Sequence, residues 1–347
     1  MAITRIDCHK TIAKNSRASK GKDLSITELI LEKYELPPIK DLEYLGGAGG
    51  FSGAQLWKIT TVDFKQYCLR RWPRSHPDRE RLDWINLVLI HAVANGCVQV
   101  AVPIESRRGQ RYVQQSEFLW ELAKWMPGVA DFSSDPNPER LENAARTLAQ
   151  FHLASAQVQL DFRKSPNAQS RHESLQQSAA LLSSIEQAPG VTEIPSINFL
   201  RELVVKKRQM FANQLASQLE PFLNEIFPVQ PVIRDVWHDH VLFTGNEVTG
   251  VVDFGAMAID NIALDLSRLL GSLVADQPER WELAIQAYSE LRPLQPREIE
   301  FAMALDRCSA FLGSLNWLKW ILLEGRSFES TDAVEKRIVG LIARLSV

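Results

Sequence analysis

The sequence has few cysteines, no long apolar run and no apolar N-terminal segment, and each absence excludes a class of protein. Its four cysteines are scattered and form no CxxC pair, which argues against a disulfide framework or a cysteine-based zinc site. No apolar run approaches the roughly 18 residues that a membrane-spanning helix needs. The N-terminus lacks the apolar core of a secretory signal. We therefore expect a cytoplasmic protein with no membrane partner.

The chain also has little net charge and no internal repeat or low-complexity segment. A formal net charge of −3 argues against nucleic acid as a partner. Its 347 residues, 45% hydrophobic and 23% charged, are typical of a globular protein with one large or two medium domains. Composition alone is compatible with a monomer or a homodimer.

A proline–glycine break at Met126–Gly128 separates two parts of different character. We expect a polar tail over residues 1–22, a β-rich lobe over 23–127 and a helical lobe over 128–347. In the first lobe, strands are expected at Ala54–Thr61, Phe64–Leu69, Ala101–Ile104 and Tyr112–Trp125, with a helix at Asp78–Val93. In the second, helices are expected from Asn137 and at Ile197–Leu219, Ile262–Val274, Glu279–Leu291, Pro296–Leu322 and Thr331–Leu345, and a polar loop at Gln157–Ser178.

A glycine-rich segment, Gly46–Gly53, precedes the first expected strand, Ala54–Thr61. Its glycines allow close backbone approach, so that consecutive amide groups could face phosphate oxygens. A mobile hairpin turn is the plain alternative. Arg70 ends the following strand on the same face as Cys68, where a cation could reach phosphates. Glu80, or Asp83 on the next helical turn, could pair with Arg70, although either acid could equally be part of a solvated surface.

Two carboxylates near the middle of the helical lobe are the strongest functional signal. Asp235 and Asp253 lie 18 positions apart (253 − 235), and each follows an apolar run. A carboxylate at the end of a buried strand is costly unless it is paired or bound to a metal. Transfer of a phosphoryl group needs such a pair, with one carboxylate to orient and deprotonate a hydroxyl and one to hold a divalent cation. An acid that only caps a turn remains the alternative for either residue.

These segments resemble, in order and spacing, the aminoglycoside phosphotransferase and choline kinase-like family, whose signature is H-G-D-x-x-x-x-N-x-L followed by an apolar strand ending in D-F or D-W. The resemblance covers most of residues 40–320. It implies an α+β, protein-kinase-like fold with two lobes and the active site in a cleft between them. It further implies ATP and Mg²⁺ as cofactors. The implied roles are Asp235 as catalytic base, Asp253 as metal ligand, Asp265 as a structural acid, Gly49, Gly50, Ser52 and Arg70 at the phosphates, Glu80 as partner of Arg70, and Glu121 and Ala123 at the adenine.

Three residues depart from that signature. Ile233 stands at the histidine, Arg234 at the glycine, and His240 at the metal-binding asparagine. Imidazole suits softer cations than Mg²⁺, so His240 as a ligand makes Mn²⁺ an alternative cofactor. Arg234 could stabilise the charged Asp235 or bind substrate phosphate, or form a structural ion pair.

We therefore predict an ATP-dependent phosphotransferase that acts on a hydroxyl of a small molecule. The first alternative is a catalytically weak or inactive kinase-like protein that binds nucleotide as a sensor or scaffold. The second is a metal hydrolase built around His238 and His240, which would share one face of a strand.

Overall fold

The protein was analysed as a computed structural model that describes residues 26–46, 53–190, 194–328 and 330–346. These residues form two compact units. The first contains residues 26–46, 53–79 and 103–125, and the second contains the other described residues. The helix that follows the third strand therefore belongs mostly to the second unit.

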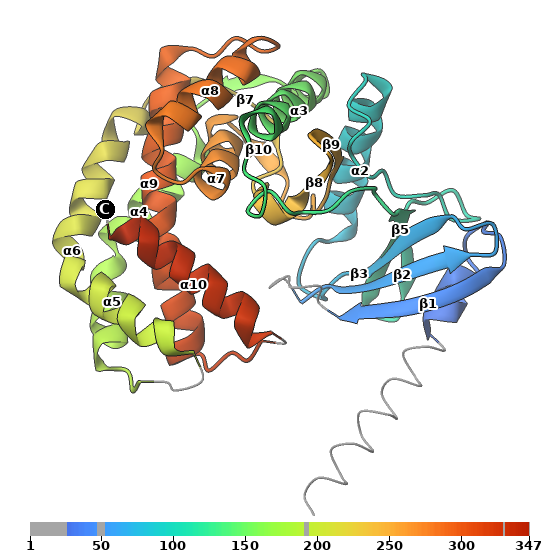
Figure 1. The fold of residues 1–347 in the computed structure, drawn as a ribbon, viewed down its shortest axis with the longest axis horizontal. Coiled ribbons are helices and arrows are strands. Elements are labelled where there is room, and N and C mark those ends of the chain that lie inside the picture. Colours follow the sequence, from blue (N-terminus) through green and yellow to red (C-terminus); the bar gives the residue numbers. More distant parts are fainter. Residues whose placement is uncertain (1–25, 47–52, 191–193, 329, 347) are drawn as a thin grey trace, which may run out of the picture. The chain divides into compact units, whose positions relative to one another are not determined.

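The first unit is an antiparallel sheet with one short helical segment, residues 26–31 (Figure 1). Side chains alternate along β2, so that Trp57 and Ile59 are buried, and Leu69, Trp120 and Leu122 face the same core. The rings of Trp57 and Trp120 lie 5.2 Å apart. The strand order is β1-β2-β3-β5-β4, with β1 at Ile39–Gly46, β2 at Gln55–Thr61, β3 at Gln66–Arg71, β4 at Val113–Gln115 and β5 at Phe118–Lys124.

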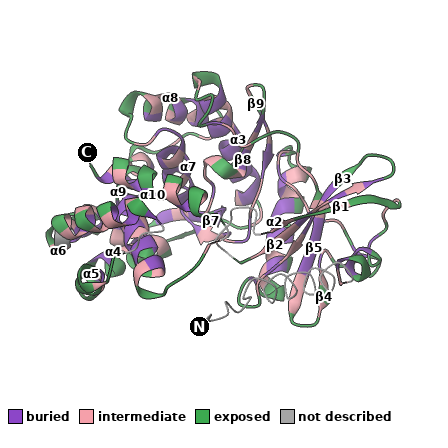
Figure 2. Ribbon diagram, turned by 60° about the horizontal axis from the view of Figure 1, so that its bottom comes forward, coloured by how far each residue is buried: buried purple, intermediate pink, exposed green. Residues whose placement is uncertain are grey.

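The second unit is mainly helical and has one continuous apolar core. Helix α6 packs on α9, and α9 packs on α7. Figure 2 shows exposed residues along α5 and α6, as expected for amphipathic helices on one core. The helices are α2 (Arg79–Ala94), α3 (Pro138–Ala156), α4 (Pro166–Gln176), α5 (Ser178–Gln187), α6 (Pro195–Leu223), α7 (Ala263–Leu273), α8 (Pro278–Ser289), α9 (Pro296–Leu318), a π-helical turn (Lys319–Leu323) and α10 (Thr331–Leu345).

Five short strands in the second unit position the acidic residues. A three-stranded sheet has the order β10-β7-β6, and a separate hairpin pairs β8 with β9. These strands are β6 (Asp161–Arg163), β7 (Phe227–Val232), β8 (Val241–Thr244), β9 (Glu247–Val251) and β10 (Ala258–Asp260). Asp235 follows β7 and Asp253 follows β9, as the apolar runs in the sequence predicted.

The predicted loop at Gln157–Ser178 is wrong, because this stretch contains β6 and α4. Helix α4 has a typical helix start: Ser165 caps it by accepting a hydrogen bond from the Ala168 amide at 3.2 Å, and Pro166 occupies its first turn. The polar composition of the stretch hides this start in the sequence. The predicted strand at Ala101–Ile104 is also wrong. Only Pro103 there makes a bridge, to Ala123.

Candidate active site

The turn after β7 carries Asp235 and is held by a buried acid. Arg234 has a positive φ of 68°, which is uncommon for a non-glycine residue and needs local support. Support comes from Asp265 on α7, whose two carboxylate oxygens accept the amide protons of Ile233 and Arg234, each at 2.6 Å. The structural role predicted for Asp265 therefore has a geometric basis: it fixes the backbone immediately before Asp235.

Asp265 is itself fixed by a buried histidine and tyrosine. His152 Nε2 lies 3.1 Å from Asp265 Oδ2, and His152 Nδ1 lies 2.7 Å from the Tyr288 hydroxyl. Burial lowers the pKa of His152 and raises that of Tyr288, so both groups are neutral near pH 7. Because the carboxylate only accepts, His152 donates from Nε2 and accepts the tyrosine proton at Nδ1.

Asp235 points one carboxylate oxygen at an arginine of α7. Arg268 donates to Asp235 Oδ1 from Nη2 at 2.8 Å and from Nε at 3.1 Å. Both bonds go to the same oxygen, so Arg268 orients the carboxylate without using Oδ2. The Asp235 side chain remains 44% exposed. This geometry holds the acid in one orientation and leaves it accessible to a hydroxyl.

His240 lies beside Asp253 and is held as one tautomer. Its Nδ1 lies 2.5 Å from the Asp235 carbonyl oxygen, to which it must donate, and its Nε2 accepts from the Trp237 indole N–H at 2.9 Å. His240 Nε2 is 3.9 Å from Asp253 Oδ2. A cation at Asp253 could reach His240 only through the lone pair that Trp237 now occupies.

The donor set at Asp253 suits a divalent cation bound mainly by phosphate and water. Mg²⁺ typically uses one or two carboxylates and takes its other ligands from phosphates and water. Asp253 is 31% exposed and can serve in this way. Within the described ranges, no group of three or more histidine, cysteine, aspartate or glutamate side chains comes together as a metal site. Residues 238–240 form a 3₁₀ turn, so the strand assumed for the hydrolase alternative is wrong.

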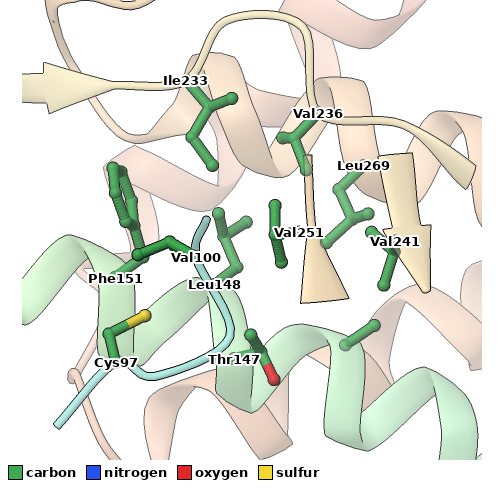
Figure 3. Close-up of a pocket in the computed structure, with 11 residues that line it drawn as sticks. Cys97, Val100, Thr147, Leu148, Phe151, Ile233, Val236, Val241, Val251 and Leu269 are labelled. Carbon is green, nitrogen blue, oxygen red and sulfur yellow. The ribbon is translucent and has the colours of Figure 1, made fainter. Parts of the chain in front are cut away.

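A small apolar cavity lies beneath the Asp235 turn (Figure 3). Its volume is about 10 Å³, and Ile233, Val236, Val251 and Leu269 point toward it from the turn, β9 and α7. An imidazole at position 233 would place polar nitrogens in this apolar setting, where they would need partners. The departure at Ile233 is thus explained by packing.

The predicted nucleotide residues of the first unit lie on adjacent strands. Arg70 is the register partner of Glu121, and its guanidinium lies over the Trp72 ring, 4.6 Å from the centroid. Glu121 is buried, and its Oε2 accepts from the Trp72 indole at 2.6 Å, so its side chain has a structural role. Ala123 pairs with Cys68. The adenine contacts proposed for Glu121 and Ala123 stay predictions.

The other predicted positions are not tested by the described structure. Gly49, Gly50 and Ser52 lie outside the described residues. Glu80 and Asp83 are exposed on α2, in the part that belongs to the helical unit, so pairing of either acid with Arg70 stays a prediction.

Three arginines near the acids were missed by sequence reasoning. Arg81 of α2 donates to the carbonyls of Ala256, at 3.4 Å, and Met257, which anchors the segment after Asp253. Arg268 contacts Asp235, and Arg337 of α10 stacks on Trp237. Arg268 follows Asp265 by one helical turn, a spacing that could have placed both on the face toward the turn. No comparable signal marks Arg81 or Arg337.

Comparison with known proteins agrees with this geometry. Residues 45–301 match the Phosphotransferase enzyme family. A homoserine kinase of Parvibaculum lavamentivorans is 23% identical over 291 residues, which cover 82% of this chain and 81% of that protein. A spectinomycin phosphotransferase in complex with ADP and spectinomycin shares the fold at a TM-score of 0.67 and 14% identity, covering 93% of this chain and 98% of that one.

An amicoumacin kinase in complex with AMP-PNP and Ca²⁺ shares the fold at a TM-score of 0.63 and 14% identity, with 95% of each chain covered. No helix among the described residues is long and apolar enough to span a bilayer. The predictions of a kinase-like fold and of a small-molecule kinase are confirmed, and the chain belongs to the phosphotransferase enzyme family.

Proposed function

We propose that the protein transfers the γ-phosphate of ATP to a hydroxyl group of a small molecule, with Asp235 as catalytic base. The observation that carries this proposal is the presentation of Asp235: Asp265 holds the backbone of the two residues before it, Arg268 holds Oδ1, and Oδ2 is left for an acceptor. Phosphoryl transfer depends mainly on positioning and electrostatic stabilisation, which a constrained carboxylate provides.

The other residues receive roles that match their chemistry. Asp253 would hold Mg²⁺ or Mn²⁺, and the cation would neutralise the phosphates. Arg234, whose side chain is exposed at the turn, is available to a transferring phosphate. Arg70, Gly49, Gly50 and Ser52 would bind the phosphates, with Glu80 as partner of Arg70. The backbone of Glu121 and Ala123 would read adenine.

The names of the relatives support a small hydroxylated acceptor. The Parvibaculum lavamentivorans relative is called a homoserine kinase, and the two structural neighbours hold ADP or AMP-PNP. We therefore propose an amino alcohol or hydroxy amino acid as the acceptor, and L-homoserine as the first compound to test.

The test is ADP release across L-homoserine, choline, 3-amino-1-propanol and spectinomycin, with a thermal shift for ATP in Mg²⁺ or Mn²⁺. Asp235→Asn keeps the side-chain shape but removes the base, and should lower kcat by about 10²–10⁴. The control is Asp239→Asn, because Asp239 is 52% exposed and its one ion pair among the described residues is with His238. Turnover unaffected by Asp235→Asn would refute the assignment of the base.

A catalytically weak nucleotide-binding protein is the second candidate. The observation in its favour is the hydrogen bond from the Trp237 N–H to His240 Nε2. This bond occupies the lone pair with which His240 would act as a second metal ligand. A thermal shift with nucleotide but no ADP release from any acceptor would favour this candidate over the kinase.

A further inference from the structure

Arg337 of α10 lies beside the Asp235 turn and takes no part in the roles assigned above. Its guanidinium lies over the indole of Trp237, 4.6 Å from the ring centroid, and Arg268 lies 5.5 Å from the same ring. Trp237 thus contacts two guanidinium groups. Arg268 is hydrogen-bonded to Asp235, and Arg337 is not.

The arginines around this turn differ in whether they have a partner. Arg268 is bonded to Asp235, and Arg344, about two turns further along α10, is bonded to Asp306 and Asp276. Within the part of the chain that the structure describes, Arg337 donates no hydrogen bond and makes no ion pair, and its guanidinium stacks on the Trp237 ring.

The Arg337 side chain is nevertheless partly buried. Burial is the main cause that lowers its pKa to about 10, and the Arg268 charge lowers it further, whereas Asp235 and Asp239 raise it. Asp239 is half-exposed and lies 3.5 Å from His238 Nε2. The Arg337 guanidinium is partly buried, has five N–H donors and accepts no hydrogen bond, so its donors can bind an anion that reaches its edge.

We infer that Arg337 binds a carboxylate of the acceptor and so places a nearby hydroxyl at Asp235. This inference rests on the proposed function and specifies its substrate class. Stacking on Trp237 uses the face of the guanidinium and leaves its edge donors for a planar, two-oxygen anion. Since Asp235 already balances the charge of Arg268, Arg337 contributes one positive charge, which matches a monoanionic carboxylate better than a phosphate dianion.

The acceptor test compares compounds that differ in the anionic group. L-Homoserine carries a hydroxyl, an amine and a carboxylate, and 3-amino-1-propanol is the same molecule without the carboxylate. The wild-type protein should prefer L-homoserine by about 10–100-fold in kcat/KM. This is the factor that the free energy of one charge-assisted hydrogen bond corresponds to. Equal kcat/KM for the two compounds would overturn the inference. Preference for glycerol 3-phosphate over L-homoserine would overturn it in favour of a phosphate.

The variant test is Arg337→Gln, with Arg326→Gln as matched control. Arg326 also stacks on a tryptophan, Trp320, at 4.8 Å, but its ion pair is with Glu324. Arg337→Gln should raise KM for L-homoserine by about 10–100-fold and leave kcat/KM for 3-amino-1-propanol unchanged. Arg337→Lys should recover part of the loss. Equal losses for both acceptors would mean that Arg337 is only structural.

Calorimetric binding of the same acceptors separates this inference from the proposed function. Binding of L-homoserine that Arg337→Gln removes would support the carboxylate site even if no ADP were released, and the missing turnover would then count against the kinase alone. Turnover of 3-amino-1-propanol with no advantage for L-homoserine would support the kinase and overturn the carboxylate site. Absence of both L-homoserine binding and L-homoserine turnover would also overturn it.

Discussion

His240 shows at the residue scale how one substitution changes a site through its neighbours. Asparagine would offer a carbonyl oxygen, whereas His240 offers one nitrogen lone pair, which the Trp237 indole already occupies. A cation that binds there must therefore displace a hydrogen bond, which weakens the second ligand position.

We expect His240→Asn and Trp237→Phe to change cation preference in opposite directions. His240→Asn supplies an oxygen and should increase the affinity for Mg²⁺ relative to Mn²⁺. Trp237→Phe frees Nε2 and should favour Mn²⁺. Calorimetric titration of each cation into the nucleotide complex measures this ratio without relying on turnover. An unchanged ratio in both variants would show that His240 is not a ligand.

Some candidate site residues could be chosen from the sequence because their position requires a chemical explanation. Acids that follow buried strands, as Asp235 and Asp253 do, are costly without a role, whereas Asp265 was identified through the resemblance to the family. Arg268 and Arg337 were missed because an arginine on an amphipathic helix is ordinary, and only the fold brings both to Trp237.

At the element scale, the segment before α3 depends on a glycine that no other residue can replace. Gly128 has a φ of 98°, and a Cβ there would lie 2.8 Å from the Phe243 carbonyl oxygen and also meet the Thr249 hydroxyl. Hydrogen bonds of 2.9 Å run in both directions between Val129 and Phe243, so the segment cannot move away without losing its pairing with β8.

We expect Gly128→Ala to lower the free energy of unfolding by about 2–5 kcal/mol, the sum of overpacking and a disfavoured φ. Gly245→Ala is the control: its φ is 59° but nothing lies within 4 Å of the added Cβ, so about 1–2 kcal/mol is expected. Urea denaturation compares the two. Equal losses would show that the contacts with Phe243 and Thr249 relax.

Elements with a clear apolar period were predicted closely, and those without one were not. Helix α10 has the predicted bounds, Thr331–Leu345, because its buried residues recur at helical spacing. Helix α4 buries only Ala168, His172 and Leu175 and therefore lacks an obvious apolar face.

At the scale of the whole molecule, the order of the segments predicted the family, and the two compact units contain a sheet and a set of helices as expected. The boundaries at residues 22 and 127 stay predictions. The contribution of α2 to the helical unit was not foreseen, because a sequence position between strands carries no information on which core a helix joins.

The buried histidine gives the whole molecule a pH dependence of stability. Burial lowers the pKa of His152, so above about pH 6.5 it is neutral in both states and has no effect. Below about pH 6.5 the unfolded chain takes up a proton that the folded chain refuses, and the free energy of unfolding falls by up to about 1.4 kcal/mol per pH unit. Burial raises the pKa values of Asp260 and Asp306. At lower pH these two acids therefore take up protons more readily in the folded chain, which opposes the fall in the free energy of unfolding.

We therefore expect lower stability near pH 5.5 than near pH 7.5, and a flatter profile for His152→Gln than for wild type. Urea denaturation across this range measures both, with exposed His76→Gln as control. A profile for His152→Gln as steep as that of the wild type would assign the dependence to other groups.

The hydrogen bonds of the Asp265 carboxylate also bear on how the protein could be regulated. It binds the turn before Asp235 on one side and His152 on the other, and it is fully buried. To rearrange that turn, a modification or an effector would have to break bonds in the same core that keeps the helices folded. The turn that carries Asp235 is therefore poorly suited to act as an on–off switch.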